Sequence, residues 1–148
     1  MIKRIKWGCS IIIAILVLFL SAQFILPRST ESVVGYSLKT SRCGIMAVLS
    51  ETSASQSVGL DQTQMAAVSE MLSSISLRRT FEKGNVISHK DGFGWYDIAF
   101  SDENGQVFQP TMQVDSNGDV FIDCVKYEIV DEAKKMELME LLGTICGR

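Results

Sequence analysis

The sequence predicts an α+β protein in which an N-terminal transmembrane helix precedes a small domain with an antiparallel meander sheet and two helices packed on one face. Three observations predict it: a long uncharged run near the N-terminus, two Asp-x-Asn-Gly motifs between alternating apolar runs, and two capped segments with apolar residues at helical spacing. The chain has 148 residues, of which 47% are hydrophobic, so it can form one folded domain with a tail.

The first expected element is a membrane anchor over residues 7–27. No charged residue lies between Lys6 and Arg28, and a helix of this length matches a hydrocarbon core of roughly 30 Å. Three of residues 1–6 are basic, which predicts a cytoplasmic N-terminus and a C-terminal domain outside the cell membrane. The predicted localisation is therefore single-pass, with the domain on the extracytoplasmic side.

Two alternatives to an anchor concern processing. Cleavage after Ala22 would turn the run into a signal peptide and the chain into a secreted protein. A lipoprotein would need a cysteine after the apolar run, whereas Cys9 precedes it. We therefore expect an anchor or an uncleaved signal segment and leave the cleaved form open.

The charge of the outer part argues against one class of partner. Residues 29–148 hold all 17 acidic residues and a net charge of −7, which repels nucleic acid. The expected partners are the membrane, through the chain's own helix, and an envelope protein.

The outer part divides into a tether over residues 28–44 and an extracytoplasmic α+β domain over residues 45–148. The apolar run 45–49 predicts a buried strand, and the Ser/Thr-rich run 50–57 predicts a loop. A helix follows, because Asp61 and Gln64 form a capping-box pattern before apolar residues at helical spacing. That apolar face consists of Met65, Val68, Leu72 and Ile75.

The meander is predicted between residues 95 and 127. Three-residue loops that end at Gly105 and Gly118 place Phe100 opposite Phe108 and Val114 opposite Val120. Each loop then has its glycine in the left-handed region, in a type I turn with a G1 bulge. Pro110 interrupts the middle strand, because proline has no donor for the ladder, so we expect a bulge or a break there.

A second helix closes the chain. Asp131 is the expected N-cap, Gly143 is the expected C-cap, and the apolar face consists of Leu138, Leu141, Leu142 and Ile145.

These motifs together carry a resemblance. The capped helix that ends near residues 77–80, the Tyr96-Asp97-Ile98 segment, the two turns and the closing segment span residues 60–142. They resemble small membrane-tethered or lipoprotein-like extracytoplasmic domains of bacteria that have no assigned function. This chain departs from the lipoprotein version because it lacks a lipobox cysteine. The resemblance implies an architecture and supplies no catalytic residue.

Cysteines are candidates for a disulfide. Cys43 and Cys146 lie near the two ends of the domain and could form a bridge in a compartment that permits disulfides, while the odd number of outer cysteines leaves at least one free or paired between chains. The strand pattern places Cys124 inward, as a core thiol.

The sequence predicts no catalytic residue, metal site or cofactor site. Asp115, Asn117 and Asp119 invite comparison with a calcium loop, but an EF-hand requires Gly and Glu where this chain has Val120 and Lys126. Asp97, Thr111 and Asp123 are predicted to form one row across the outer face of the sheet. Asp97 and Asp123 are therefore the acids that would act in the alternative function, an envelope-acting hydrolase or hydrolase inhibitor.

Aromatic residues on the same face are the candidates for binding. Trp95, Phe121 and Tyr127 are predicted to lie there together with Val125, and exposed aromatic residues on a sheet are typical of partner surfaces. The expected function is a membrane-anchored extracytoplasmic binding or accessory domain.

Overall fold

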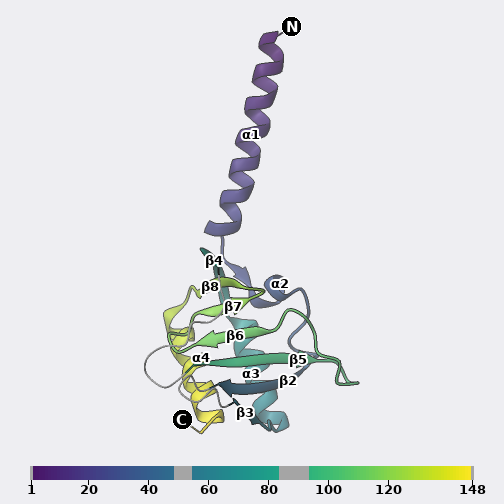
Figure 1. The fold of residues 1–148 in the computed structure, drawn as a ribbon, viewed down its shortest axis with the longest axis vertical. Coiled ribbons are helices and arrows are strands. Elements are labelled where there is room, and N and C mark those ends of the chain that lie inside the picture. The colour runs from purple at the N-terminus through teal and green to yellow at the C-terminus, as the bar shows by residue number, and fades with distance from the viewer. Residues whose placement is uncertain (1, 49–54, 84–93, 148) are drawn as a thin grey trace.

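The computed structural model describes residues 2–48, 55–83 and 94–147. Within these ranges the chain forms four helices and eight strands (Figure 1). In chain order they are α1 (Ile2–Ile25), β1 (Arg28–Ser29), α2 (Thr30–Val34), β2 (Arg42–Val48), β3 (Ser55–Val58), α3 (Gln62–Ser74), β4 (Ser76–Lys83), β5 (Trp95–Ser101), β6 (Met112–Asp115), β7 (Val120–Ile122), β8 (Val125–Ile129) and α4 (Glu132–Ile145).

All eight strands belong to one antiparallel sheet. Their order is β1-β4-β8-β7-β6-β5-β2-β3, so the expected meander β5–β8 forms its centre. Helices α3 and α4 contact each other and lie across the same side of the sheet (Figure 1). The α+β class with an antiparallel sheet is confirmed, and the sheet is larger than the meander that the turns predicted.

The core fills the space between the sheet and these helices. Strand β5 alternates between buried and half-buried residues, and its buried side meets Leu72 of α3 and Leu138 of α4. The apolar face of the meander is buried at Tyr96, Ile98, Phe100, Met112, Val114, Val120 and Ile122, whereas Phe108 is half-buried. Their burial supplies the main stabilisation of the domain, at about 1.5–3 kcal/mol for each large side chain.

Both predicted N-caps are present. Asp61 accepts a hydrogen bond from Gln64 N, and Gln64 Oε1 accepts one from Asp61 N, which completes the capping box. Asp131 accepts from the backbone at the start of α4. The predicted C-cap at Gly143 is wrong: α4 continues to Ile145 and ends at Cys146, because the apolar face extends one turn past the glycine.

The two Asp-x-Asn-Gly turns have the predicted form. Gly105 and Gly118 have φ values of +82° and +76°, and Phe108 N donates to Phe100 O. In each turn the aspartate that opens the motif accepts two backbone N–H groups through Oδ1, from residues two and four positions later. These bonds hold the pKa of Asp102 below its usual range.

The expected irregularity at Pro110 is also present. The Gln109–Pro110 peptide is cis, and β6 begins only at Met112. Beyond this interruption Ile98 pairs with Met112, two residues further along than continuous pairing from Phe100 and Phe108 would give. Asp97 therefore lies opposite Gln113 rather than Thr111.

Residues 120–127 do not form the single third strand of the meander that the sequence pattern predicts. Asp123 and Cys124 have φ values of 51° and 60°, and they form the two-residue turn of a hairpin between β7 and β8. Two successive residues in the left-handed region are typical of a type I′ turn, which suits the twist of paired strands. Cys124 is consequently exposed, and its predicted inward position is wrong.

The segment expected as a tether contributes to the folded body. Residues 28–29 pair with β4, and Val34 and Leu38 are buried in the core. Thr30 is also buried, and its hydroxyl donates to Ile75 O. On the other side of β2, residues 55–58 of the expected Ser/Thr-rich loop pair with it as strand β3, because the edge of β2 offers them backbone partners.

Helix α1 projects from the β1–β4 edge of the sheet (Figure 1). At its base Phe24 stacks on Phe81, with ring centroids 4.3 Å apart, and the Arg79 guanidinium lies 5.1 Å from the Phe24 centroid. Among the residues that the structure describes, no helix combines the length and the apolarity that crossing a bilayer requires. The transmembrane helix predicted over residues 7–27 is therefore not supported.

Candidate functional site

The outer face of the sheet, which we define as the face opposite α3 and α4, carries most of the predicted site residues. Along β5 the residues Trp95, Asp97 and Ala99 alternate with the core and are half-buried. Ladder pairing places Gln113 opposite Asp97, and Lys126 opposite Phe121. This face is thus a mixed aromatic and polar surface built from β5 to β8.

Asp97 is the centre of a small hydrogen-bond network on this face. Trp95 Nε1 donates to Asp97 Oδ2 over 3.1 Å, and Gln113 Nε2 donates to Asp97 Oδ1 over 2.8 Å. Residues two apart on a strand share a face, which explains the contact with Trp95, and cross-strand pairing explains the contact with Gln113. Both carboxylate oxygens are therefore engaged, and the indole ring is held beside the acid.

Two hollows lie side by side along this face. The first has a volume of about 450 Å³, and Gly44, Met46, Asp97 and Ala99 line it. The second has a volume of about 210 Å³ and is lined by residues that include Phe121 and the Asp123-Cys124 turn. Thr111 lines both, so the hollows are neighbours on the outer face, and we refer to the pair of them as the groove. Its larger part has the size of a ligand pocket.

The structure brings two of the three predicted aromatic residues to the outer face. Trp95 and Phe121 lie on it, whereas Tyr127 pairs with Val120 and packs against the core. The hairpin turn at Asp123-Cys124 reverses the chain, so that even-numbered residues of β8 share a side with Phe121. The placement of Tyr127 and Val125 on the outer face is therefore wrong, and Lys126 takes the expected place of Tyr127.

The predicted row of Asp97, Thr111 and Asp123 does not form as a strand-to-strand ladder. Asp97 faces Gln113, and Asp123 occupies the hairpin turn. Asp97 lines the larger hollow and Asp123 the smaller one, and Thr111 lies between them. The irregular segment around Pro110 separates the two acids, which a register drawn through a continuous strand could not show.

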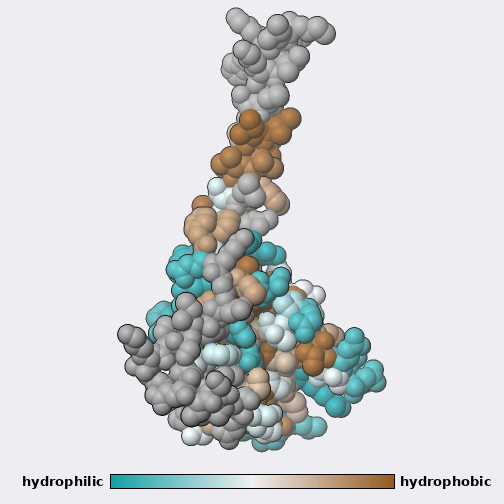
Figure 2. Space-filling view, in the orientation of Figure 1, coloured by the Kyte–Doolittle hydropathy of each residue, from teal (hydrophilic) through white to brown (hydrophobic). Residues whose placement is uncertain are grey.

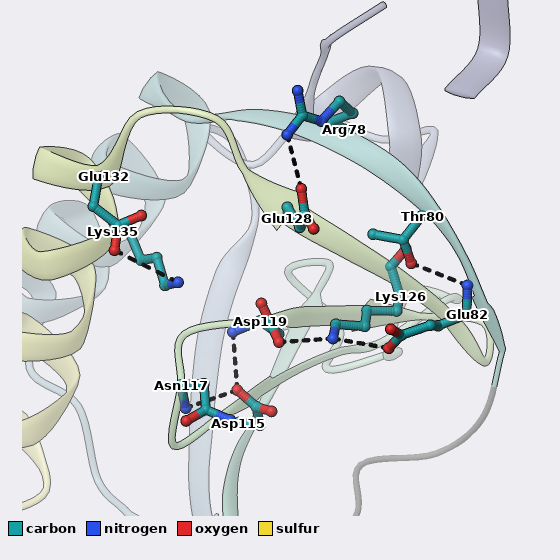
Figure 3. Close-up of polar contacts among 10 residues, drawn as sticks. All are labelled: Arg78, Thr80, Glu82, Asp115, Asn117, Asp119, Lys126, Glu128, Glu132 and Lys135. Carbon is teal, nitrogen blue, oxygen red and sulfur yellow. Dashed lines mark hydrogen bonds and ion pairs between the residues drawn. The ribbon is translucent and has the colours of Figure 1, made fainter. Parts of the chain in front are cut away.

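An ion-pair network borders the outer face (Figure 3). Lys126 Nζ lies 2.9 Å from Glu82 and 3.0 Å from Asp119, and so joins β4, β8 and the turn after β6. The hydrogen bonds to Glu82 and then to Asp119 hold the pKa of Lys126 above its usual range. Beside it, the Thr80 hydroxyl donates to Lys126 O across the irregular part of the β4–β8 ladder. Lys126 is therefore held in place by two carboxylates, on the same side of the sheet as Phe121.

Cys43 does not form the bridge with Cys146 that the sequence allows. It is a free thiol in β2, buried beside Phe100, and burial raises its pKa to about 12. A thiol with this pKa stays protonated and unreactive at neutral pH.

No cluster of three His, Cys, Asp or Glu side chains within the described ranges is arranged to hold a metal ion.

Searches against protein-family models, curated proteins and solved structures found no match for this chain. The site must therefore be interpreted from its own geometry. Sequence reasoning missed the Trp95–Asp97–Gln113 network, although the Trp-x-Asp spacing on an alternating strand was the signal for its first half.

Proposed function

We propose that this chain is an extracytoplasmic binding or accessory domain, which helix α1 holds at a membrane and which binds a partner through the groove on its outer face. The observation that carries the proposal is the uncovered apolar surface of α1. Between Ile11 and Phe19 every large hydrophobic side chain is more than half exposed (Figure 2). Successive residues of a helix point about 100° apart, so this surface surrounds the helix on all sides.

An all-round apolar helix is stable only in apolar surroundings. The main contact between the body and α1 is at the base of the helix, through β4. Burial of each of these side chains would contribute about 1.5–3 kcal/mol, which a lipid phase supplies. The basic residues within residues 1–6 support an orientation with the folded body on the extracytoplasmic side.

The groove supports the binding part of the proposal. Phe121 and Asp97 line it, and the Asp97 carboxylate is already oriented by two donors, Trp95 and Gln113. Partner surfaces are typically enriched in Trp and other aromatic residues, with polar groups at the rim. The engagement of both Asp97 oxygens gives no support to the alternative of hydrolysis by Asp97 and Asp123.

Flotation with vesicles tests the attachment. The full chain is expected to float with vesicles and to resist alkaline extraction. Replacement of Ile13 and Leu16 with Lys should release it, because a lysine within a bilayer costs about 2.5–3.5 kcal/mol. Met136→Lys is the matched control, since it places the same charge on an exposed position of the body. Release by the control alone, or flotation of the double variant, contradicts the proposal.

Photo-cross-linking tests the binding face. A photoreactive amino acid at Phe121 on the full chain in its native membrane is expected to give a discrete adduct that Trp95→Ala weakens. The same amino acid at Met136, which is exposed on α4, should give none. Equal adducts from both positions, or none from Phe121, would show that the outer face is not the binding surface.

A further inference from the structure

We propose that a second cavity, between the segment 39–42 and helix α3, binds a small organic anion. The cavity has a volume of about 550 Å³, within the range of pockets that hold small molecules. It is separate from the outer-face groove, with which it shares no lining residue. The proposal therefore does not depend on the function proposed above.

Two cations at the cavity give it a charge unlike that of the rest of the body. Lys39 and Arg42 both line it, and neither forms an ion pair with any residue in the described part of the chain. The outer part of the chain has a net charge of −7, whereas two cations and one acid, Glu70, line this cavity, so the cavity attracts anions locally. Arginine is well suited to the task, because its planar guanidinium binds a carboxylate or phosphate through two parallel hydrogen bonds.

A hydroxyl in the wall of the cavity points to the same conclusion. Ser69 is only 6% exposed and lines the cavity, where its hydroxyl is available to a ligand. On the same face of α3, Gln62, Met65 and Ala66 precede Ser69 at helical spacing and complete the wall.

The segment that carries the cations is fixed before any ligand arrives. Glu31 Oε1 accepts a hydrogen bond from Leu38 N over 2.9 Å, and Leu38 itself is fully buried. The Ser41 hydroxyl donates to Ser37 O over 2.6 Å, which closes the turn between Leu38 and β2. A preorganised segment loses little conformational entropy on binding, so more of the interaction energy appears as affinity.

The lining also defines the rest of the ligand. Glu70 at the cavity repels a bare, highly charged anion but accepts hydrogen bonds from hydroxyl groups. Gln62 and Ser69 both donate and accept. The chemistry that fits is therefore a carboxylate or phosphate attached to a hydroxyl-bearing body, with the anionic group at Lys39 and Arg42.

Titration of the full chain in detergent micelles, followed by amide chemical shifts in NMR, tests the proposal. The probes are glucuronate, glucose 6-phosphate and neutral glucose. At least one anion is expected to shift the amide signals of Ala66 and Ser69 in a saturable manner, and glucose should not. Saturation by glucuronate alone identifies a carboxylate ligand, and saturation by glucose 6-phosphate alone identifies a phosphate ligand.

Three variants locate the binding. Arg42→Gln should weaken the affinity about tenfold, as expected for the loss of one charge-assisted contact. Ser69→Ala should weaken it without any change of charge. Arg78→Gln is the matched control, because it removes an exposed arginine charge from β4. The proposal is overturned if neither anion shifts these signals at about 10 mM, if glucose binds equally well, or if Arg78→Gln weakens binding as much as Arg42→Gln.

Discussion

The two turn glycines provide a matched pair for measuring how α4 packs on the sheet. Gly105 and Gly118 have nearly the same left-handed φ, but a Cβ at Gly105 would have open space around it. A Cβ at Gly118 would lie 2.9 Å from both Cε and Cγ of Lys135 on α4. Replacement of each glycine with Ala therefore imposes the same backbone cost, and only Gly118→Ala adds a collision.

The magnitudes follow from this geometry. An L-residue in the left-handed region costs about 1–2 kcal/mol, so Gly105→Ala should lower the free energy of unfolding by about 1 kcal/mol. Gly118→Ala must also move the Lys135 side chain by several tenths of an ångström, away from its preferred rotamer, which adds about 0.5–1.5 kcal/mol. Because the clashing atoms belong to a flexible side chain, the total should stay near about 2 kcal/mol rather than abolish folding.

Urea denaturation of the full chain in detergent, followed by tryptophan fluorescence, measures both values. Lys135→Ala provides the decisive background, because it removes the clashing atoms and should bring Gly118→Ala to the same cost as Gly105→Ala. The reasoning is refuted if Gly105→Ala is the more destabilising of the two. It is also refuted if the difference between them persists without the Lys135 side chain.

Three further predictions concern α3, the buried thiol and the segment before β2. Ser73 Oγ is buried and has no hydrogen-bond partner in the described part of the chain, so Ser73→Ala should raise the free energy of unfolding by about 1 kcal/mol, whereas the exposed neighbour Ser74 should give no gain on the same replacement. Burial raises the pKa of Cys43 from 9.0 to about 12. The buried, protonated thiol therefore contributes its full stability below pH 9.0, and this contribution falls as the pH rises toward 12. Cys43→Ala should flatten that fall in urea denaturation measured across this pH range. Leu38→Ala should lower the free energy of unfolding by about 2–5 kcal/mol, and a loss under 1 kcal/mol would show that this segment is not part of the core.

Local chemistry made much of the centre of the fold predictable. The capping box at Asp61 and the turns at Gly105 and Gly118 depend on residues within five positions of one another, so the sequence displays them directly. The pairing of Val114 with Val120 followed from turn length and alternation alone. The irregularity at Pro110 was predicted for the same reason, since a missing donor is a local property.

Predictions that required distant partners were less successful. Residues 28–29 and 55–58 become strands because the exposed edges of β4 and β2 offer them hydrogen-bond partners, which no local pattern reveals. Tyr127 was assigned to the wrong face because Asp123 and Cys124 adopt left-handed conformations that neither residue type signals strongly. For the candidate site, Trp95 and Phe121 were found by alternation, whereas Gln113 replaced Thr111 opposite Asp97 because the register shifts at Pro110.

The strand order has a consequence for how the chain assembles during synthesis. Strand β4 pairs with β1 and β8 only, among the strands that the structure describes, and β8 in turn connects β4 to β7. The β2–β3 hairpin and the β5–β7 meander with β2 can complete their ladders earlier, from strands already made. The two halves of the sheet share a ladder only when residues 125–129 have left the ribosome, so β8 is the strand that unites the sheet.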